Sequence, residues 1–149
     1  MQLIMIVFSL LFLSLSACNP SSPASGGRWY TAQQVTTGKS VFKQHCASCH
    51  GDRAQGLAAD WQQRLPDGSY PPPPLNGSAH AWHHPLPLLT EIIRKGGALY
   101  DGRMPGFVDT LSNDQQLAAI AWFQSLWSKD VYQFWSKTES QIQQQGDKL

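Results

Sequence analysis

The sequence is poor in charge, and the charge that it has is nearly balanced. Its 149 residues include 11 Lys and Arg against 10 Asp and Glu, so we expect no basic surface that would attract nucleic acid. Long apolar runs are also missing. Residues 3–15 carry no charge, but a membrane-spanning helix needs about 20 such residues. The length suits one domain with a modest core.

Cysteine is scarce as well, because the chain contains only three. Two of them lie in residues 46–50, which read Cys-Ala-Ser-Cys-His. Two thiols three positions apart can each add across a vinyl group of one haem, and the histidine that follows then lies under the iron. The pattern therefore predicts one covalently bound haem c attached at Cys46 and Cys49, with His50 as an axial ligand of the iron.

Two other readings of the same residues are open. Thiolate and imidazole are the usual ligands of zinc, so Cys46, Cys49 and two histidines could form a zinc site. A thioredoxin-like dithiol would need a strand before the motif and a βαβ context after it, and the sequence predicts neither.

The N-terminus predicts export. Residues 3–15 are typical of the apolar core of a signal peptide, and Leu15-Ser-Ala-Cys18 resembles the lipobox of bacterial lipoproteins. We therefore expect residues 1–17 to be removed and Cys18 to be lipidated. The usual basic segment before the apolar core is missing, so an uncleaved membrane anchor is the alternative. Either reading predicts a periplasmic protein held at the inner or the outer membrane of a bacterium.

After Cys18 the chain is small and polar up to about residue 28, without an apolar period. Such a segment cannot bury enough surface to order itself, and we interpret residues 18–28 as a flexible tether. The folded domain is then predicted over residues 29–128, followed by a C-terminal helical extension over residues 129–149.

A first helix is predicted to begin after Thr31 and to run to about His45. Thr31 and Gln34 match a capping box, which is a signal for a helix start. Gly38 lies in the middle of this helix, where glycine costs about 1 kcal/mol relative to alanine. We therefore expect another helix to cross close to Gly38, although the glycine could also be a simple flaw in the helix.

Residues 38–42, Gly-Lys-Ser-Val-Phe, followed by the motif at 46–50 and Gly51, resemble the first helix and haem loop of class I cytochromes c. The resemblance covers residues 31–128 and is poor over residues 55–70. It implies an all-α class I cytochrome c fold, with helices wrapped around one covalently bound haem. It also implies that the first helix packs on an aromatic residue of the last one, here Trp122.

The four prolines of residues 71–74 predict a stiff, extended loop. The resemblance implies that a proline carbonyl in this loop accepts the Nδ1 proton of His50, which fixes the ring and raises its basicity. We expect this proline to be Pro74, with Leu75 against the haem. An ordinary proline-rich surface loop is the alternative.

Met104 is the only methionine outside the leader, and it lies in a loop bounded by glycines. The resemblance implies that its thioether is the sixth ligand of the iron, a soft donor that raises the reduction potential. Alternatively, Met104 fills a gap in the core. The iron would then be five-coordinate, and the protein could bind gases or act as a peroxidase.

Three further segments are predicted to be helical. Residues 86–95 carry apolar side chains at helical spacing and are followed by Gly96. A second capping box, at Ser112 and Gln115, starts a broadly apolar helix that contains Trp122. Beyond it comes an amphipathic helix that either packs on the domain or docks a partner; its expected apolar face consists of Val131, Phe134, Trp135 and Ile142.

Between the loop and the second helix lie His80, His83 and His84. Adjacent residues on a regular element point apart, so a shared metal site is awkward for this group. We expect structural roles or contacts with the haem propionates, with a metal site or a rival axial ligand as the lesser alternatives.

These features together favour electron transfer over catalysis, because no general base, nucleophile or phosphate loop accompanies the motif. We expect an electron carrier, or an accessory subunit of a larger oxidoreductase, that receives electrons from one redox protein at the membrane and passes them to another. The alternatives are a haem enzyme or gas sensor with an open sixth position, or a metal-binding lipoprotein without haem.

Overall fold

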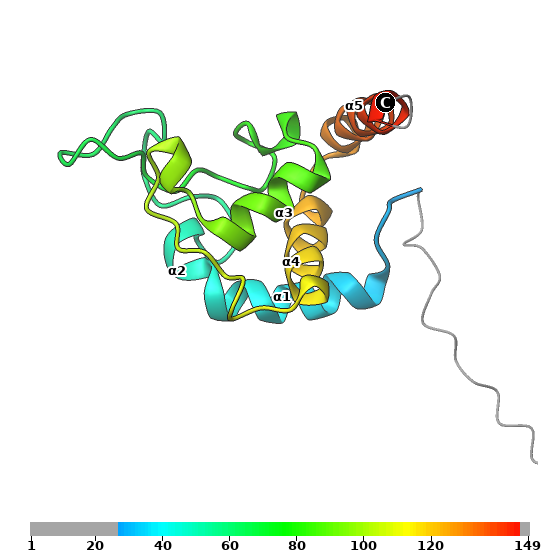
Figure 1. Cartoon of the computed structure of the whole chain (residues 1–149), viewed down its shortest axis with the longest axis horizontal. Coiled ribbons are helices and arrows are strands. Elements are labelled where there is room, and N and C mark those ends of the chain that lie inside the picture. Colours follow the sequence, from blue (N-terminus) through cyan, green and yellow to red (C-terminus); the bar gives the residue numbers. More distant parts are fainter. Residues whose placement is uncertain (1–26, 147–149) are drawn as a thin grey trace, which may run out of the picture.

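The computed structural model describes residues 27–146, and within them the protein is built of helices without a strand (Figure 1). The predicted signal peptide, lipidated Cys18 and nearly all of the tether lie outside the described residues. The elements, in chain order, are α1 (Ala32–His45), α2 (Ala47–His50), η1 (Ala81–His83), α3 (Leu86–Lys95), η2 (Ala98–Tyr100), α4 (Asn113–Ser125) and α5 (Lys129–Gly146).

Both predicted capping boxes are present. The Gln34 N–H donates to the Thr31 hydroxyl at 3.1 Å, and the Thr31 N–H donates back to Gln34 Oε1 at 2.9 Å. Ser112 and Gln115 form the same pair of bonds at the start of α4. These reciprocal bonds satisfy backbone donors that a helix start would otherwise leave free, so α1 and α4 begin where the sequence predicts.

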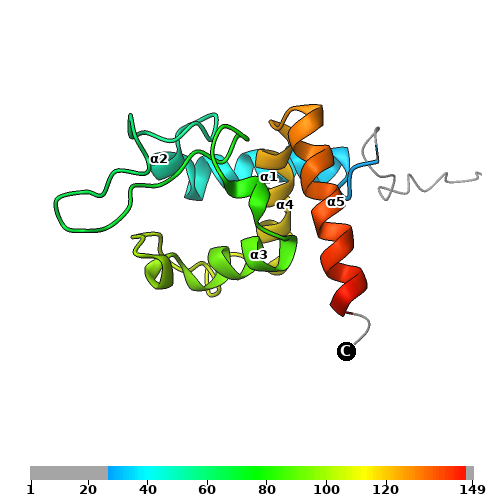
Figure 2. The ribbon, with the colours of Figure 1, turned by 90° about the horizontal axis from the view of Figure 1, so that it is seen from above.

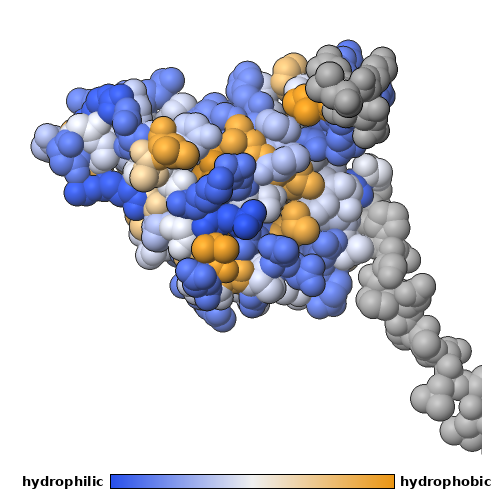
Figure 3. Space-filling view, in the orientation of Figure 1, coloured by the Kyte–Doolittle hydropathy of each residue, from blue (hydrophilic) through white to orange (hydrophobic). Residues whose placement is uncertain are grey.

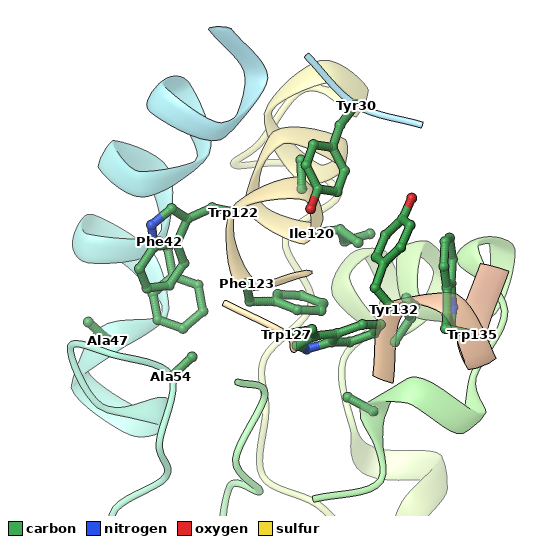
Figure 4. Close-up of a cluster of buried hydrophobic side chains, with 13 residues drawn as sticks. Tyr30, Phe42, Ala47, Ala54, Ile120, Trp122, Phe123, Trp127, Tyr132 and Trp135 are labelled. Atoms are coloured by element: carbon green, nitrogen blue, oxygen red, sulfur yellow. The ribbon is translucent and has the colours of Figure 1, made fainter. Parts of the chain in front are cut away.

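Helices α1 and α4 cross in close contact at Gly38, as its position in mid-helix predicted. A Cβ atom at Gly38 would lie 1.8 Å from the Ala118 carbonyl oxygen and 2.9 Å from Cβ of Trp122. One turn further along α1, Phe42 packs on Trp122 with 4.3 Å between ring centroids (Figure 4). This contact fixes α1, and therefore the Cys-x-x-Cys-His motif that follows it, against α4.

The large side chains of the core are mainly aromatic. Figure 4 shows a second group of rings, Trp127, Tyr132 and Trp135, next to Phe123 of α4. Trp127 and Trp135 meet edge to face at 6.1 Å, and the Trp127 indole N–H donates to the Leu75 carbonyl at 2.7 Å. The proline loop is thereby tied to the core at Leu75.

Helix α5 forms as predicted, but the predicted inward face is only partly right. Trp135 is buried, whereas Phe134 and Ile142 are 53% and 40% exposed. The side chains that α5 buries are Tyr132, Trp135 and Glu139. Val131 is partly buried and packs on the core cluster, so the prediction holds for Val131 and Trp135. It omitted Glu139 because this buried residue is a carboxylate and not an apolar side chain. Tyr132 and Trp135 join the same core cluster as α4.

The remaining surface carries hydrophobic residues in small groups among hydrophilic ones, as the face in Figure 3 shows. No helix within residues 27–146 combines the length and the apolar composition that crossing a bilayer requires.

Candidate cofactor site

The Cys-x-x-Cys-His motif lies at the junction of α1 and the short helix α2. The Cys46 N–H continues the α1 ladder by donating to the Phe42 carbonyl at 2.9 Å, and the His50 N–H donates to the Cys46 carbonyl at 2.9 Å. Gly51 ends α2 with φ +80°, a conformation that favours glycine. The local helix thus holds Cys46, Cys49 and His50 in a fixed relation, and all three line one cavity.

Both thiols are free. Burial raises the pKa of Cys46 to about 11, with a further contribution from the neighbouring Cys49. Cys46 is therefore a thiol and not a reactive thiolate at neutral pH. In the described part of the chain no three His, Cys, Asp or Glu side chains are grouped so that they could hold a metal ion. The described residues therefore provide no ligand set for a zinc ion.

The ring of His50 is held by a proline carbonyl, but by Pro73 and not by the predicted Pro74. His50 Nδ1 donates to the Pro73 oxygen at 2.8 Å. An extended proline segment forms a polyproline II helix with three residues per turn, so its successive carbonyls point in different directions. The ring of Pro74 instead packs on Gly56. A Cβ added to Gly56 would lie 3.1 Å from Pro74 Cγ and Cδ. Leu75 lines the cavity.

The hydrogen bond to Pro73 also defines the state of the imidazole. A carbonyl only accepts, so Nδ1 carries the proton and Nε2 keeps its lone pair. Burial lowers the pKa of His50, and the bond to Pro73 opposes that change only in part. His50 is therefore a neutral imidazole that offers one nitrogen as a ligand, with the other nitrogen fixed.

The cavity has a volume of about 730 Å³, within the range of cofactor sites. Apolar side chains make up most of its wall; they include Phe42, Leu75, Leu88, Leu89, Ile92, Ile93, Phe107 and Phe123. A large apolar cavity, two thiols and a neutral, oriented imidazole are the groups that a covalently attached haem needs. The residues present therefore fit haem c.

Met104 lines the same cavity from the chain that follows α3. Its carbonyl accepts from the Gly97 N–H at 2.9 Å, and a Cβ on Gly96 would lie 2.5 Å from that carbonyl oxygen. The two glycines therefore allow the Met104 loop to lie directly on the end of α3. Figure 2 shows this part of the chain apart from α2, and His50 and Met104 both line the cavity.

The histidine group divides between the cavity and the surface. His80 stacks on Trp61 with 4.6 Å between ring centroids and meets His84 edge to face at 5.1 Å. Trp61, His80 and His84 line the cavity. Burial lowers the pKa of both of these histidines, and the nearby His83 adds to the effect. His83 stacks on Trp82, outside the cavity wall.

Sequence reasoning missed the segment 64–70, which is fastened to the residues just before Met104. Arg64 pairs with Asp101 at 2.8 Å, and the Tyr70 N–H donates to the Asp101 carbonyl at 2.8 Å. A second ion pair joins Arg103 and Asp67. These contacts link residues more than thirty positions apart and leave no local pattern, so no sequence signal could have indicated them.

One comparison with known proteins finds a matching family. The model of the family described as cytochrome C oxidase, cbb3-type, subunit III matches residues 33–123. The match includes Cys46, Cys49, His50 and Met104 and ends before α5. No curated protein matches the chain. No solved structure matches it either.

Proposed function

Because this chain belongs to the family of cytochrome C oxidase, cbb3-type, subunit III, and is thus a class I c-type cytochrome with covalently bound haem c, we propose that it carries single electrons at a membrane with His50 and Met104 as axial ligands. One haem is attached, through Cys46 and Cys49. The observation that carries the proposal is the neutral His50, which is oriented by Pro73 in the same cavity that Met104 lines.

When bound, haem c supplies a one-electron couple between ferrous and ferric iron. The residues of the chain tune that couple. Pro73 accepts the Nδ1 proton of His50 and makes the imidazole a better donor. Met104 adds a neutral thioether, which favours the ferrous form. The apolar wall formed by Phe42, Leu89 and other side chains disfavours the extra charge of the ferric form.

A rigid ligand set is what electron transfer needs, because small changes in geometry between oxidation states keep the reorganisation barrier low. His50 is fixed by its bond to Pro73, and the Met104 backbone is fixed on α3. The family description supports redox partners within an oxidase complex. We therefore propose that the electron passes to or through such a complex, with this chain as a carrier or subunit and not as the catalytic centre.

Replacing Met104 with leucine tests the ligation. Leucine fills a similar volume, so the fold should persist, but it has no sulfur. We expect the ferric variant to lose the methionine–iron absorption band and its reduction potential to fall by on the order of 0.1 V or more. The measurement is a redox titration of both proteins with spectra of both oxidation states. A wild-type protein without that band would support the open-site haem enzyme or gas sensor instead.

Tethering is tested by replacing Cys18 with serine. If Cys18 carries the lipid, the wild-type protein should be cleaved before Cys18 and should take up labelled fatty acid, whereas the variant should do neither, with its haem spectrum unchanged. Fatty-acid labelling and the N-terminal mass of the purified protein measure this directly. A wild-type protein that keeps residues 1–17 and carries no fatty acid would favour an uncleaved apolar anchor at residues 3–15.

A further inference from the structure

We propose that Glu139 of α5 is a positioning residue for Met104. Its carboxylate fixes one end of α3, and the other end of α3 carries the Met104 loop. The inference rests on the proposed function in one respect, namely that Met104 is a ligand of the iron. It assigns a role to α5, which lies beyond the residues that match the family.

The contact of Glu139 with α3 is buried and specific. The Leu86 N–H, the first of the helix, donates to Glu139 Oε2 at 2.8 Å. Glu139 is only 7% exposed, and its other oxygen accepts from Gln143 Nε2 at 3.0 Å. A negative charge at a helix N-terminus is favourable because of the helix dipole. The carboxylate therefore acts as a cap supplied by a distant helix.

Helix α3 has no cap of its own. Its N-cap residue is Pro85, which makes no side-chain hydrogen bond to the helix, and Pro87 has no N–H to offer. Buried donors at a helix start need partners, and Glu139 provides the side-chain partner that Pro85 cannot. This explains why α5 buries a carboxylate on the face where the sequence pattern suggested apolar residues.

A second contact from α5 holds the residues just before α3. The Trp135 indole N–H donates to the His84 carbonyl at 2.9 Å. One turn earlier on the same face, α5 also contacts the chain's N-terminal segment, because the Trp29 N–H donates to the Tyr132 hydroxyl at 3.1 Å and Arg28 lies 4.0 Å over the Tyr132 ring. Of these contacts, those of Glu139 and Trp135 reach the start of α3 directly.

The opposite end of α3 is bonded to the Met104 loop along its backbone. The Gly97 N–H donates to the Met104 carbonyl at 2.9 Å, and the Phe107 N–H donates to the Ile93 carbonyl at 2.9 Å. A Cβ on Gly106 would lie 2.7 Å from the Arg94 carbonyl oxygen, so the loop follows the last turn of α3 closely. A ten-residue helix of about 15 Å transmits a shift at its start to its end.

Helix α3 also forms part of the cavity wall, with Leu89, Ile92 and Ile93 among its lining residues. Loosening its N-terminal end would therefore affect both the wall and the Met104 loop. The predicted consequence is a methionine that leaves the iron more readily, with the rest of the site intact.

The experiment compares Glu139→Ala with Glu139→Gln in the full-length, haem-loaded protein. The glutamine oxygen can still accept from the Leu86 N–H, whereas alanine cannot. Free imidazole competes with Met104 for ferric iron, and its binding is followed by the loss of the methionine–iron band. We expect imidazole to bind about fivefold more tightly to Glu139→Ala, the change in equilibrium that loss of one helix cap produces, and with nearly wild-type affinity to Glu139→Gln.

The matched control is Tyr132→Phe, which removes a hydrogen bond of α5 that does not involve α3. It should leave the imidazole affinity unchanged even if the melting temperature falls. Amide hydrogen exchange provides a second measurement: residues 86–90 and 104–108 should exchange faster in Glu139→Ala only. If Glu139→Ala does not load haem, Trp135→Phe replaces it, because it removes the bond to His84 while keeping an aromatic ring in the core, and it should give a smaller increase of the same sign.

The proposal is overturned if a folded Glu139→Ala, or Trp135→Phe in its place, binds imidazole as the wild type does. Equal effects in Tyr132→Phe would also overturn it, since they would indicate general loosening of α5. Failure of the proposed function gives a different result. If Met104 is not a ligand of the iron, the Met104→Leu variant has the same spectrum as the wild-type protein.

Discussion

Replacing Cys46 and Cys49 together with alanine is expected to abolish covalent haem attachment. Each thiol is predicted to form one thioether, and no other cysteine occurs among the described residues. His50 and Met104 remain in the variant, but these non-covalent ligands do not hold haem through denaturation. Mass spectrometry of the exported protein should therefore show the bare polypeptide mass, whereas the wild type carries the additional mass of one haem.

Ser48→Ala is the matched control, because Ser48 lies between the two cysteines and is exposed. It should retain the full haem content. Covalent haem in the double variant, or a wild-type protein without the additional mass, would contradict attachment at residues 46–50.

The second large effect is expected for Gly38→Ala. Alanine is the better helix former by about 1 kcal/mol, but its Cβ would lie 1.8 Å from the Ala118 carbonyl oxygen. Backbone cannot move aside as a flexible side chain can, so α1 and α4 must separate and the contact of Phe42 with Trp122 must loosen. The steric effect outweighs the gain in helix propensity. We expect a net loss of about 3 kcal/mol of unfolding free energy.

Denaturant unfolding of the haem-loaded protein measures this loss, which corresponds to a melting temperature lower by roughly 10 °C. Ser40→Ala, on the exposed side of the same helix, should change stability by less than about 0.5 kcal/mol. A Gly38→Ala protein as stable as the wild type would mean that the two helices do not cross at the observed distance.

The features that could be predicted from the sequence are those with local causes. The capping boxes at Thr31 and Ser112 involve residues three positions apart, so the starts of α1 and α4 are visible in a short window. Gly38 was informative for a different reason. A helix interior accepts glycine only at a cost, and the close approach of Ala118 explains the cost.

The choice between Pro73 and Pro74 could not be made from the sequence. Both residues belong to one extended run, and which carbonyl faces His50 depends on how the loop lies on the core. Leu75 is held at both ends of its backbone, since its N–H donates to the Ala54 carbonyl at 2.7 Å and its carbonyl accepts from Trp127. Those two long-range bonds set the rotation of the loop.

The buried face of α5 was misread because its pattern mixes chemistries. Period-based reasoning counts apolar side chains, so it selected Phe134 and Ile142 and passed over Glu139. A buried carboxylate becomes understandable only when its partner, the Leu86 N–H, is known. The same limit applies to the ion pairs of residues 64–70, whose partners are equally distant in the chain.

The proposed ligand set is tested most directly by X-ray absorption at the iron edge of the purified ferric protein. We expect a single sulfur neighbour, from Met104, beside the nitrogens of the porphyrin and His50, and we expect this sulfur to disappear in Met104→Leu. An iron surrounded by nitrogen or oxygen alone in the wild-type protein would contradict the ligand set.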